Sequence, residues 1–155
     1  MPIIDVLDTF SSAQAVTASA ISDVKDLGPF YTSTLQSNTT VNLGATGQEV
    51  YLIINVTEAA TAAGAATVTF SLESDSTADL ATSATVHWTS AAIPKATLVA
   101  GYNVIKLCLP YGAYERYLGV RYTVATGPLT AGKFDAFLTN AADYAAYYAA
   151  GSTIQ

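Results

Sequence analysis

Residues Tyr114–Thr139, YERYLGVRYTVATGPLTAGKFDAFLT, contain the strongest strand pattern of the chain. Two runs of alternating residues flank a break at residues 126–128, Thr-Gly-Pro. In each run every second side chain is apolar, which is the period of a half-buried β-strand. The apolar face of the first run consists of Leu118, Val120, Tyr122 and Val124, and that of the second run of Phe134, Ala136 and Leu138.

Folding the two runs about the break predicts a hairpin with one packed face. In this register Tyr122 faces Phe134, and Arg121 lies opposite Asp135 on the solvent face. The same register pairs Val120 with Ala136 and Leu118 with Leu138. Apolar and opposite-charge pairs across two strands each contribute a few tenths to ~1 kcal/mol. A second sheet must then cover the packed face of the hairpin.

Other strand-like segments occur along the chain at intervals of roughly ten residues, which predicts an all-β sandwich or barrel. Gln48–Val56 is apolar on both faces, so we expect it to be central in its sheet or covered on both sides. Thr67–Glu73 alternates, with its apolar residues facing inward. The remaining predicted strands are Gln14–Leu27, with a bulge or corner at 21–24, Ala84–Thr89, and a hairpin of Ala96–Ala100 and Asn103–Leu109.

The two ends of the chain differ from this pattern and are interpreted as an N-terminal arm (1–13) and a C-terminal tail (140–155) around a sandwich domain (14–139). The arm is rich in apolar residues, and the tail carries tyrosines at helical spacing, so both are expected as extended or short-helical segments. Short segments of this kind are only marginally stable in isolation, so they must pack against the rest of the domain or against another protein. We therefore predict that they form interfaces, through Ile3, Ile4, Phe10, Tyr144, Tyr147 and Tyr148.

The composition disfavours several classes of partner. Only 12% of the 155 residues are charged, against about 25% in an average globular protein. The net charge is −6 and the six basic residues form no cluster, so we expect no nucleic-acid binding. We also expect no membrane partner and no secretory signal, because the chain lacks a long apolar run and Met1–Phe10 has no basic residue. A surface with so few charges favours the interpretation that the protein is a member of an assembly.

Two features could indicate a catalytic or nucleotide-binding site. Gly127–Lys133 matches most of a phosphate-binding loop, but Phe134 replaces the Ser or Thr that binds magnesium, so a hairpin loop is the better interpretation. His87 is the single histidine and lacks the sequence context of a catalytic triad, so we expect it at the surface or rim. We predict that the protein is not an enzyme.

Metal and disulfide sites are also not expected. Cys108 is the single cysteine, which excludes an internal disulfide and favours a packed thiol. Glu73, Asp75 and Asp79 are the best calcium candidates, but the turn glycine and distal glutamate of a hand-type loop are missing. We therefore predict no metal and no cofactor.

Three segments resemble a known family: LDTFSSAQAVTASAISDVKDLG (7–28), LATSATVHWTSAAIPKATLVAGYNVIKLCLP (80–110) and ERYLGVRYTVATGPLTAGKFDAFLT (115–139). Their order and spacing are similar to those of the jelly-roll cement, or decoration, proteins of podovirus-type tailed-phage capsids. The resemblance implies a jelly-roll-like antiparallel β-sandwich that forms dimers or other small homo-oligomers. It also implies binding to the major capsid protein on the outer surface of an icosahedral shell in the virion, without catalysis.

The sequence therefore favours a structural virion protein that clamps neighbouring capsomers. The alternative is a carbohydrate-binding β-sandwich module, in which exposed tyrosines or Trp88 would stack on sugars. A sandwich-fold enzyme is the third class, for which the chain offers no clear His or acid constellation.

Overall fold

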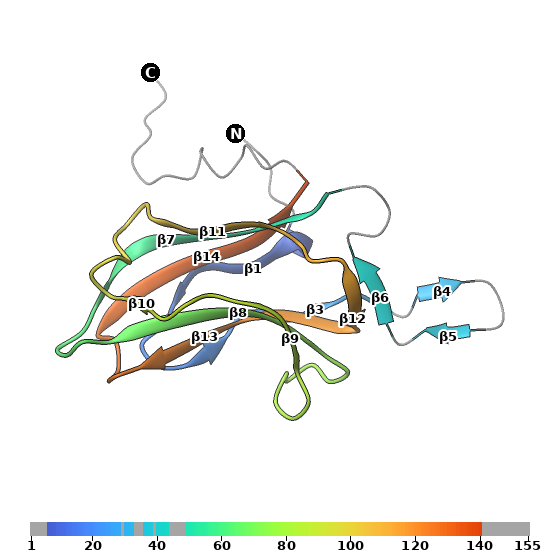
Figure 1. Cartoon of the computed structure of the whole chain (residues 1–155), viewed down its shortest axis with the longest axis horizontal. Helices are drawn as coiled ribbons and strands as arrows, with labels where there is room; N and C mark the ends of the chain where they lie inside the picture. The colour runs from blue at the N-terminus through green and yellow to red at the C-terminus, as the bar shows by residue number, and fades with distance from the viewer. Residues whose placement is uncertain (1–5, 29, 33–35, 39, 44–48, 141–155) are drawn as a thin grey trace, which may run out of the picture.

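The computed structural model describes residues 6–28, 30–32, 36–38, 40–43 and 49–140, and this part of the chain is an antiparallel β-sandwich (Figure 1). One layer is a four-stranded sheet in the order β1-β14-β7-β11. Its strands are β1 (Thr9–Ala15), β14 (Ala131–Thr139), β7 (Tyr51–Thr61) and β11 (Asn103–Cys108).

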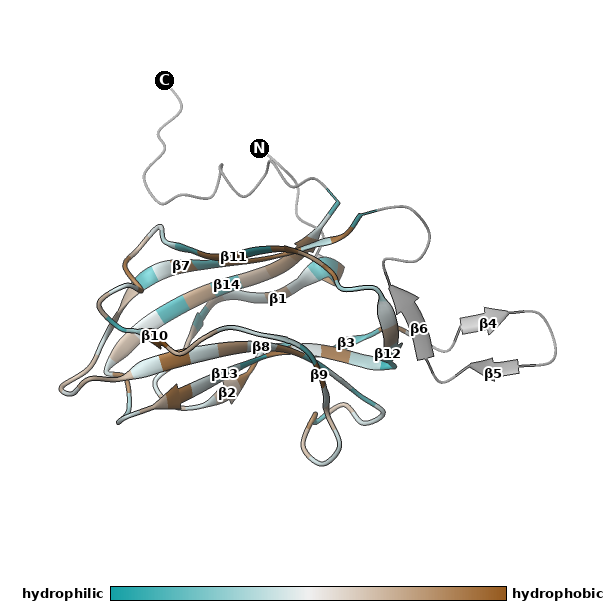
Figure 2. Ribbon diagram, viewed as in Figure 1, coloured by the Kyte–Doolittle hydropathy of each residue, from teal (hydrophilic) through white to brown (hydrophobic). Residues whose placement is uncertain are grey.

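The second layer is a six-stranded sheet in the order β10-β8-β13-β2, in which β3 also pairs with β13 and β9 with β8. Its strands are β2 (Ala20–Ile21), β3 (Lys25–Asp26), β8 (Thr67–Asp75), β9 (Thr85–Thr89), β10 (Ile93–Pro94) and β13 (Tyr117–Ala125). Hydrophobic and hydrophilic residues alternate in bands along the strands of both layers (Figure 2).

Smaller elements surround the two sheets. A 3₁₀ turn, η1 (Val6–Asp8), precedes β1. The segment between β3 and β7 contains β4 (Phe30–Thr32), β5 (Gln36–Asn38) and β6 (Thr40–Leu43). β4 pairs with β5, and β6 pairs with β12 (Gly112–Glu115).

The strand order is that of a jelly roll, so the predicted fold class is confirmed. When β2 with β3, and β9 with β10, are each counted as one position, the sandwich has eight strand positions. The first sheet then holds positions 1, 8, 3 and 6, and the second holds positions 2, 7, 4 and 5. This arrangement of two Greek keys places nearly every consecutive pair of strands in opposite sheets.

The predicted hairpin of residues 114–139 is wrong for this reason. β13 pairs with β8, whereas β14 pairs with β7 and β1, so the two runs lie in opposite sheets. Their apolar faces nevertheless point toward each other across the core. The rings of Tyr122 and Phe134 stack with centroids 5.6 Å apart and an interplanar angle of 17°. The alternation identified the inner faces correctly, but it carries no information about which strand is the hydrogen-bonded neighbour.

Residues 126–130 form the crossing between the sheets. Thr126 and Gly127 both adopt positive φ angles, of 62° and 103°, which turn the chain sharply out of β13. Leu129 is buried, and its N–H donates to the carbonyl of Thr17 at 2.9 Å. The Thr130 N–H also donates to the carbonyl of Thr61 in β7 at 2.7 Å, so packing and backbone hydrogen bonds fix the loop, and its conformation is that of a strand connection.

Three aromatic rings form the centre of the core. Phe70, on β8, lies edge-on to Tyr122 and to Phe134, at centroid distances of 5.7 and 5.3 Å. All three side chains are fully buried. The Tyr122 hydroxyl forms a 2.7 Å hydrogen bond with Ser11 Oγ on β1. Burial raises the pKa of Tyr122, so the hydroxyl stays protonated and this polar contact between the sheets persists.

β7 occupies an interior position of its sheet, as the apolar pattern predicted, but it begins three residues later and ends five residues later than the predicted strand Gln48–Val56. Leu52 and Ile54 are buried in the core between the sheets. Ile53, which points to the opposite face, is also fully buried beside its cross-strand neighbour Phe137, which is 2% exposed. The first sheet therefore has buried apolar side chains on both faces.

Arg121 does not pair with Asp135, because the two residues belong to different sheets. Its Nε donates to Glu73 Oε2 at 2.8 Å, and its Nη2 donates to the carbonyl of Leu80 at 2.5 Å. Leu80 is buried above Gly119, where a Cβ atom would lie 2.7 Å from Leu80 Cδ1. Arg121 and Gly119 thus hold the loop of residues 76–84 against the outer face of the second sheet.

Two predicted boundaries also differ from the structure. The predicted strand Ala96–Ala100 is a turn segment in the structure. Its Leu98 is buried, and the Leu98 carbonyl accepts a hydrogen bond from the Ala60 N–H at 2.8 Å, which holds the turn against β7. The predicted boundary between arm and sandwich at residues 13–14 falls within β1, which already pairs with β14 from Thr9. The break predicted at residues 21–24 is present between β2 and β3.

We predict that Tyr122→Ala lowers the free energy of unfolding by about 3–5 kcal/mol, since it removes a ring that contacts both sheets. Tyr122→Phe keeps the ring and should cost only about 1 kcal/mol, for the lost hydrogen bond to Ser11. Denaturant melts of the two variants measure both values. Equal losses would contradict the central position of the ring.

We predict that Arg121→Ala destabilises the fold by about 2 kcal/mol or more, because it leaves the carboxylate of Glu73, whose side chain is 8% exposed, without its cation. The matched control is Lys133→Ala. Its partner Glu58 is 47% exposed, so this variant should lose less than ~1 kcal/mol. Similar losses in urea melts of the two variants would show that Arg121 has only a surface role.

Candidate interaction surfaces

The predicted interface residues divide into two groups. Ile3, Ile4, Tyr144, Tyr147 and Tyr148 lie outside the described residues, so their role stays a prediction. Phe10 is in β1 and is fully buried in the core of its own chain. It therefore cannot contact a partner in the folded protein, and the interpretation of Phe10 as an interface residue is corrected. The spacing of apolar residues in the segment 3–10 did not reveal that Thr9 and Phe10 already belong to strand β1.

His87 lies at the edge of the second sheet and is part of a structural contact. Its ring stacks on Tyr114, with centroids 3.9 Å apart, and its Nε2 is 2.7 Å from Ser74 Oγ. Ser74 also accepts the backbone N–H of Glu115 at 3.1 Å. These contacts fasten β12 to β8 and β9. Ser74 is fully buried, so a substrate cannot reach its hydroxyl despite the Ser–His pairing.

The predicted calcium candidates have other partners. Glu73 binds Arg121 and accepts the Ser71 hydroxyl at 2.6 Å. Asp75 is fully buried and accepts hydrogen bonds from its own loop, including the Ser83 hydroxyl at 3.0 Å. Asp79 accepts the Thr77 hydroxyl at 2.7 Å. Across the described part of the chain, no group of three or more His, Cys, Asp and Glu residues is placed to hold a metal ion.

Cys108 is exposed, so the expected packed thiol is wrong. It is the last residue of β11, which forms an edge of the first sheet, and its cross-strand neighbour is Tyr51. The alternation of β11 turns Lys106 and Cys108 away from the core, whereas Ile105 packs against it. The apolar neighbours of Cys108 in the sequence had suggested burial, but they lie on the other face of the strand.

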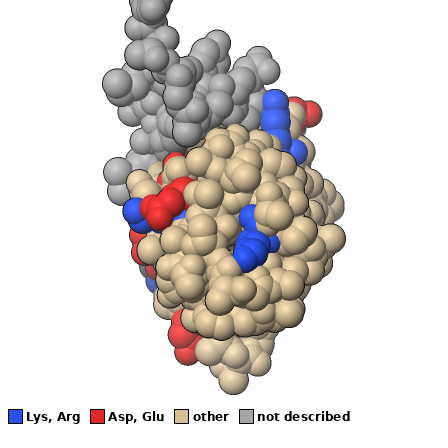
Figure 3. Space-filling view, turned by 90° about the vertical axis from the view of Figure 1, so that its left-hand side faces the viewer, with Lys and Arg blue, Asp and Glu red and all other residues tan. Residues whose placement is uncertain are grey.

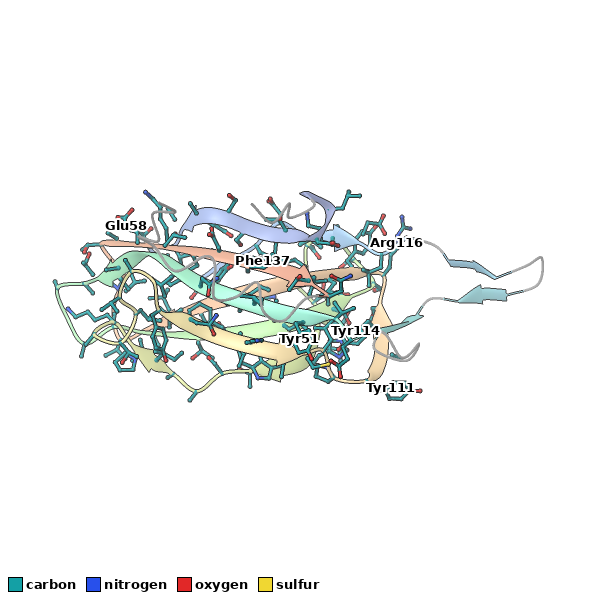
Figure 4. The ribbon with its side chains drawn as sticks, turned by 90° about the horizontal axis from the view of Figure 1, so that it is seen from above. Tyr51, Glu58, Tyr111, Tyr114, Arg116 and Phe137 are labelled. Carbon is teal, nitrogen blue, oxygen red and sulfur yellow. The ribbon has the colours of Figure 1, made fainter. Side chains whose placement is uncertain are left out.

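Four described aromatic side chains, Trp88, Tyr111, Tyr114 and Tyr51, differ in how far they are exposed to stack on a sugar. Trp88, the proposed stacking residue, packs against the core. Tyr111 is 76% exposed and projects from the end of the sandwich where Tyr51 and Tyr114 also lie (Figure 4). Tyr114 is buried, and its hydroxyl donates a hydrogen bond to the Pro110 carbonyl. The Tyr51 hydroxyl donates a hydrogen bond to the Glu49 carboxylate. Tyr111 is thus the most exposed of these four aromatic residues.

Several charged groups on the described surface form ion pairs. Three of the six basic residues form ion pairs, Arg116 with Asp26, Arg121 with Glu73 and Lys133 with Glu58. The hydrogen bonds from Arg116 and from the Gly28 N–H lower the pKa of Asp26 to about 2. These pairs further lower the number of uncompensated charges on a surface that already contains few. Among the described residues, no helix has the length and apolar character needed to cross a membrane.

We predict that His87 makes the stability of the fold depend on pH. Burial lowers the pKa of His87, although the nearby Glu115 carboxylate acts in the opposite direction. The unfolded chain therefore binds a proton more readily, and stability should fall as the pH drops through about 6.5. The difference in Tm between the wild type and His87→Gln should shrink from about pH 8 to about pH 5. A constant difference would contradict this prediction.

The chain was compared with known families and proteins. A model of Bbp16, a phage-associated family, matches residues 10–138. The match begins in β1, ends in β14 and so includes every strand of both sheets. No curated protein matches the chain. Because the family model covers well over half of its length, the chain belongs to the Bbp16 family.

Proposed function

We propose that the protein is a capsid cement, or decoration, protein that binds the outside of an icosahedral phage shell and stabilises the contacts between capsomers. The observation that carries this proposal is the charge-poor surface of the sandwich. Only 12% of the residues are charged, and half of the basic residues are paired with carboxylates. Such a surface suits a protein that is covered by other protein in an assembly. Membership of a phage-associated family supports the proposal that this assembly is a virion.

The proposed mechanism is multivalent clamping without catalysis. Each copy makes a modest contact with the major capsid protein, and copies joined in a small homo-oligomer contact two capsomers at once. The second contact then forms at a high effective concentration, which can raise the overall affinity by about 10²–10⁴. A rigid sandwich suits this role, because a link that does not deform transmits restraint from one capsomer to the next.

We predict that the purified protein binds saturably to empty shells assembled from its major capsid protein without it, and raises the temperature at which the shells break. Co-sedimentation measures occupancy, and light scattering of heated shells measures their stability. Light scattering of the free protein at micromolar concentration should give a mass above the 16.1 kDa of one chain.

The absence of co-sedimentation at micromolar concentration would contradict the proposed function. The same assay with added oligosaccharides tests the alternative of a carbohydrate-binding module. Release of the protein from shells by a sugar, together with binding of that sugar to the free protein, would favour the alternative. Tyr111→Ala would then abolish the binding of the sugar, because this ring is the most exposed stacking surface among the aromatic residues discussed above.

A further inference from the structure

One end of the sandwich is built from four loops that are far apart in the sequence. They are residues 16–19 between β1 and β2, 62–66 between β7 and β8, 95–102 between β10 and β11, and 126–130 between β13 and β14. The strands on either side of each loop run to the same end of the molecule, on the left of Figure 1. We call this surface the loop end.

Backbone hydrogen bonds join the four loops in two pairs and tie each pair to the end of β7. The 126–130 loop is bonded on both sides, from the Leu129 N–H to the Thr17 carbonyl at 2.9 Å and from the Thr130 N–H to the Thr61 carbonyl at 2.7 Å. The Lys95 N–H donates to the Ala66 carbonyl at 3.0 Å. Because these bonds hold the loops to one another and to β7, we expect the loop end to keep its shape when a partner binds.

Each loop is also anchored by a buried apolar side chain. Val16, Ala66, Leu98 and Leu129 each lie between 0 and 3% exposed. The exposed positions around these anchors are all alanine, glycine, serine, threonine or proline, apart from Val99, which is 51% exposed. The loop end is therefore an ordered surface of backbone and small side chains, which lose little conformational entropy when a partner covers them.

This surface contains almost no charge. The chain has eighteen charged residues, and only Lys95 belongs to the four loops. Its Nζ is hydrogen-bonded to the carbonyl of Ala62 in the neighbouring loop. Figure 3 looks onto this end and shows a broad uncharged surface with one basic group near its middle and other charged groups toward its margin. Residues at the opposite end of the strands, such as Asp26, Asp79 and Arg116, are charged.

Depletion of charge is typical of the buried centre of protein interfaces. Stable dimer interfaces also contain aromatic anchors, whereas the exposed positions of the loop end contain none. A contact of this kind is weak at a single site, and it suits a partner that presents the same site many times. The repeated surface of a capsid lattice is such a partner.

We propose that the loop end is the surface that seats on the shell, and that it contacts an uncharged patch of the major capsid protein. This inference rests on the proposed function and specifies how the protein meets its partner. Binding through such a surface depends little on salt, since few counterions are released and no long-range attraction is screened.

The test places a charge on the loop end and measures occupancy on shells that lack the protein. Ala63→Glu and Ala63→Lys should each reduce affinity about tenfold or more, because either charge would be buried against an uncharged patch. Ala63→Gln has a similar size and no charge, and should reduce affinity less than about threefold. Ala78→Glu, at an exposed position of the 76–84 loop at the opposite end, should have no effect. Ala100→Glu and Ala100→Lys repeat the test on a second loop.

The outcomes separate this inference from the proposed function. If the wild type binds shells and every charged variant at Ala63 and Ala100 binds equally well, the loop end is not the contact surface. If one sign of charge weakens binding and the other strengthens it, the contact is electrostatic and the inference is wrong. If the charged variants lose self-association in light scattering, the loop end joins copies of the chain instead. If the wild type fails to bind shells, the proposed function itself fails.

Discussion

The stack of Tyr122 on Phe134 is the contact on which the rest of the structure depends. It joins β13 of one sheet to β14 of the other, and Phe70 lies edge-on to both rings. The hydrogen bond between the Tyr122 and Ser11 hydroxyls adds β1 to the same cluster. Because consecutive strands lie in opposite sheets, packing across the core fixes their relative position. The loops that connect these strands then meet at one end of the molecule.

The sequence pattern predicted the faces of the strands well and their partners poorly. Alternation depends on which side of a strand is buried, so it correctly placed Tyr122 and Phe134 on facing surfaces. Hydrogen-bond pairing depends on the topology of the whole chain, which a local pattern does not contain. A jelly roll has its last two strands in opposite sheets, so the predicted hairpin conflicts with the jelly-roll-like sandwich that the resemblance implied. The same limitation explains why the true partner of Arg121, Glu73 on β8, was missed.

The candidate surface was less predictable than the fold. Small residues dominate the four loops, and none of the loops contains a motif that indicates capsid binding. Only the folded chain brings them together, and only then does their shared lack of charge become a property of one surface. The sequence did indicate, through its 12% of charged residues, that some part of the molecule would be unusually poor in charge. It could not place this part, because the charges elsewhere are also few.

The most direct measurement is a cryo-electron microscopy reconstruction of shells that carry the protein. It reports both whether the protein occupies defined sites on the lattice and which surface of the sandwich meets the capsid. Our account predicts ordered sandwiches that stand on the shell with residues 62–66 and 95–102 against the major capsid protein. Sandwiches that lie with a sheet face on the shell, or that contact it through the 76–84 loop, would contradict the assignment of the contact surface. Shells without bound protein would contradict the proposed function.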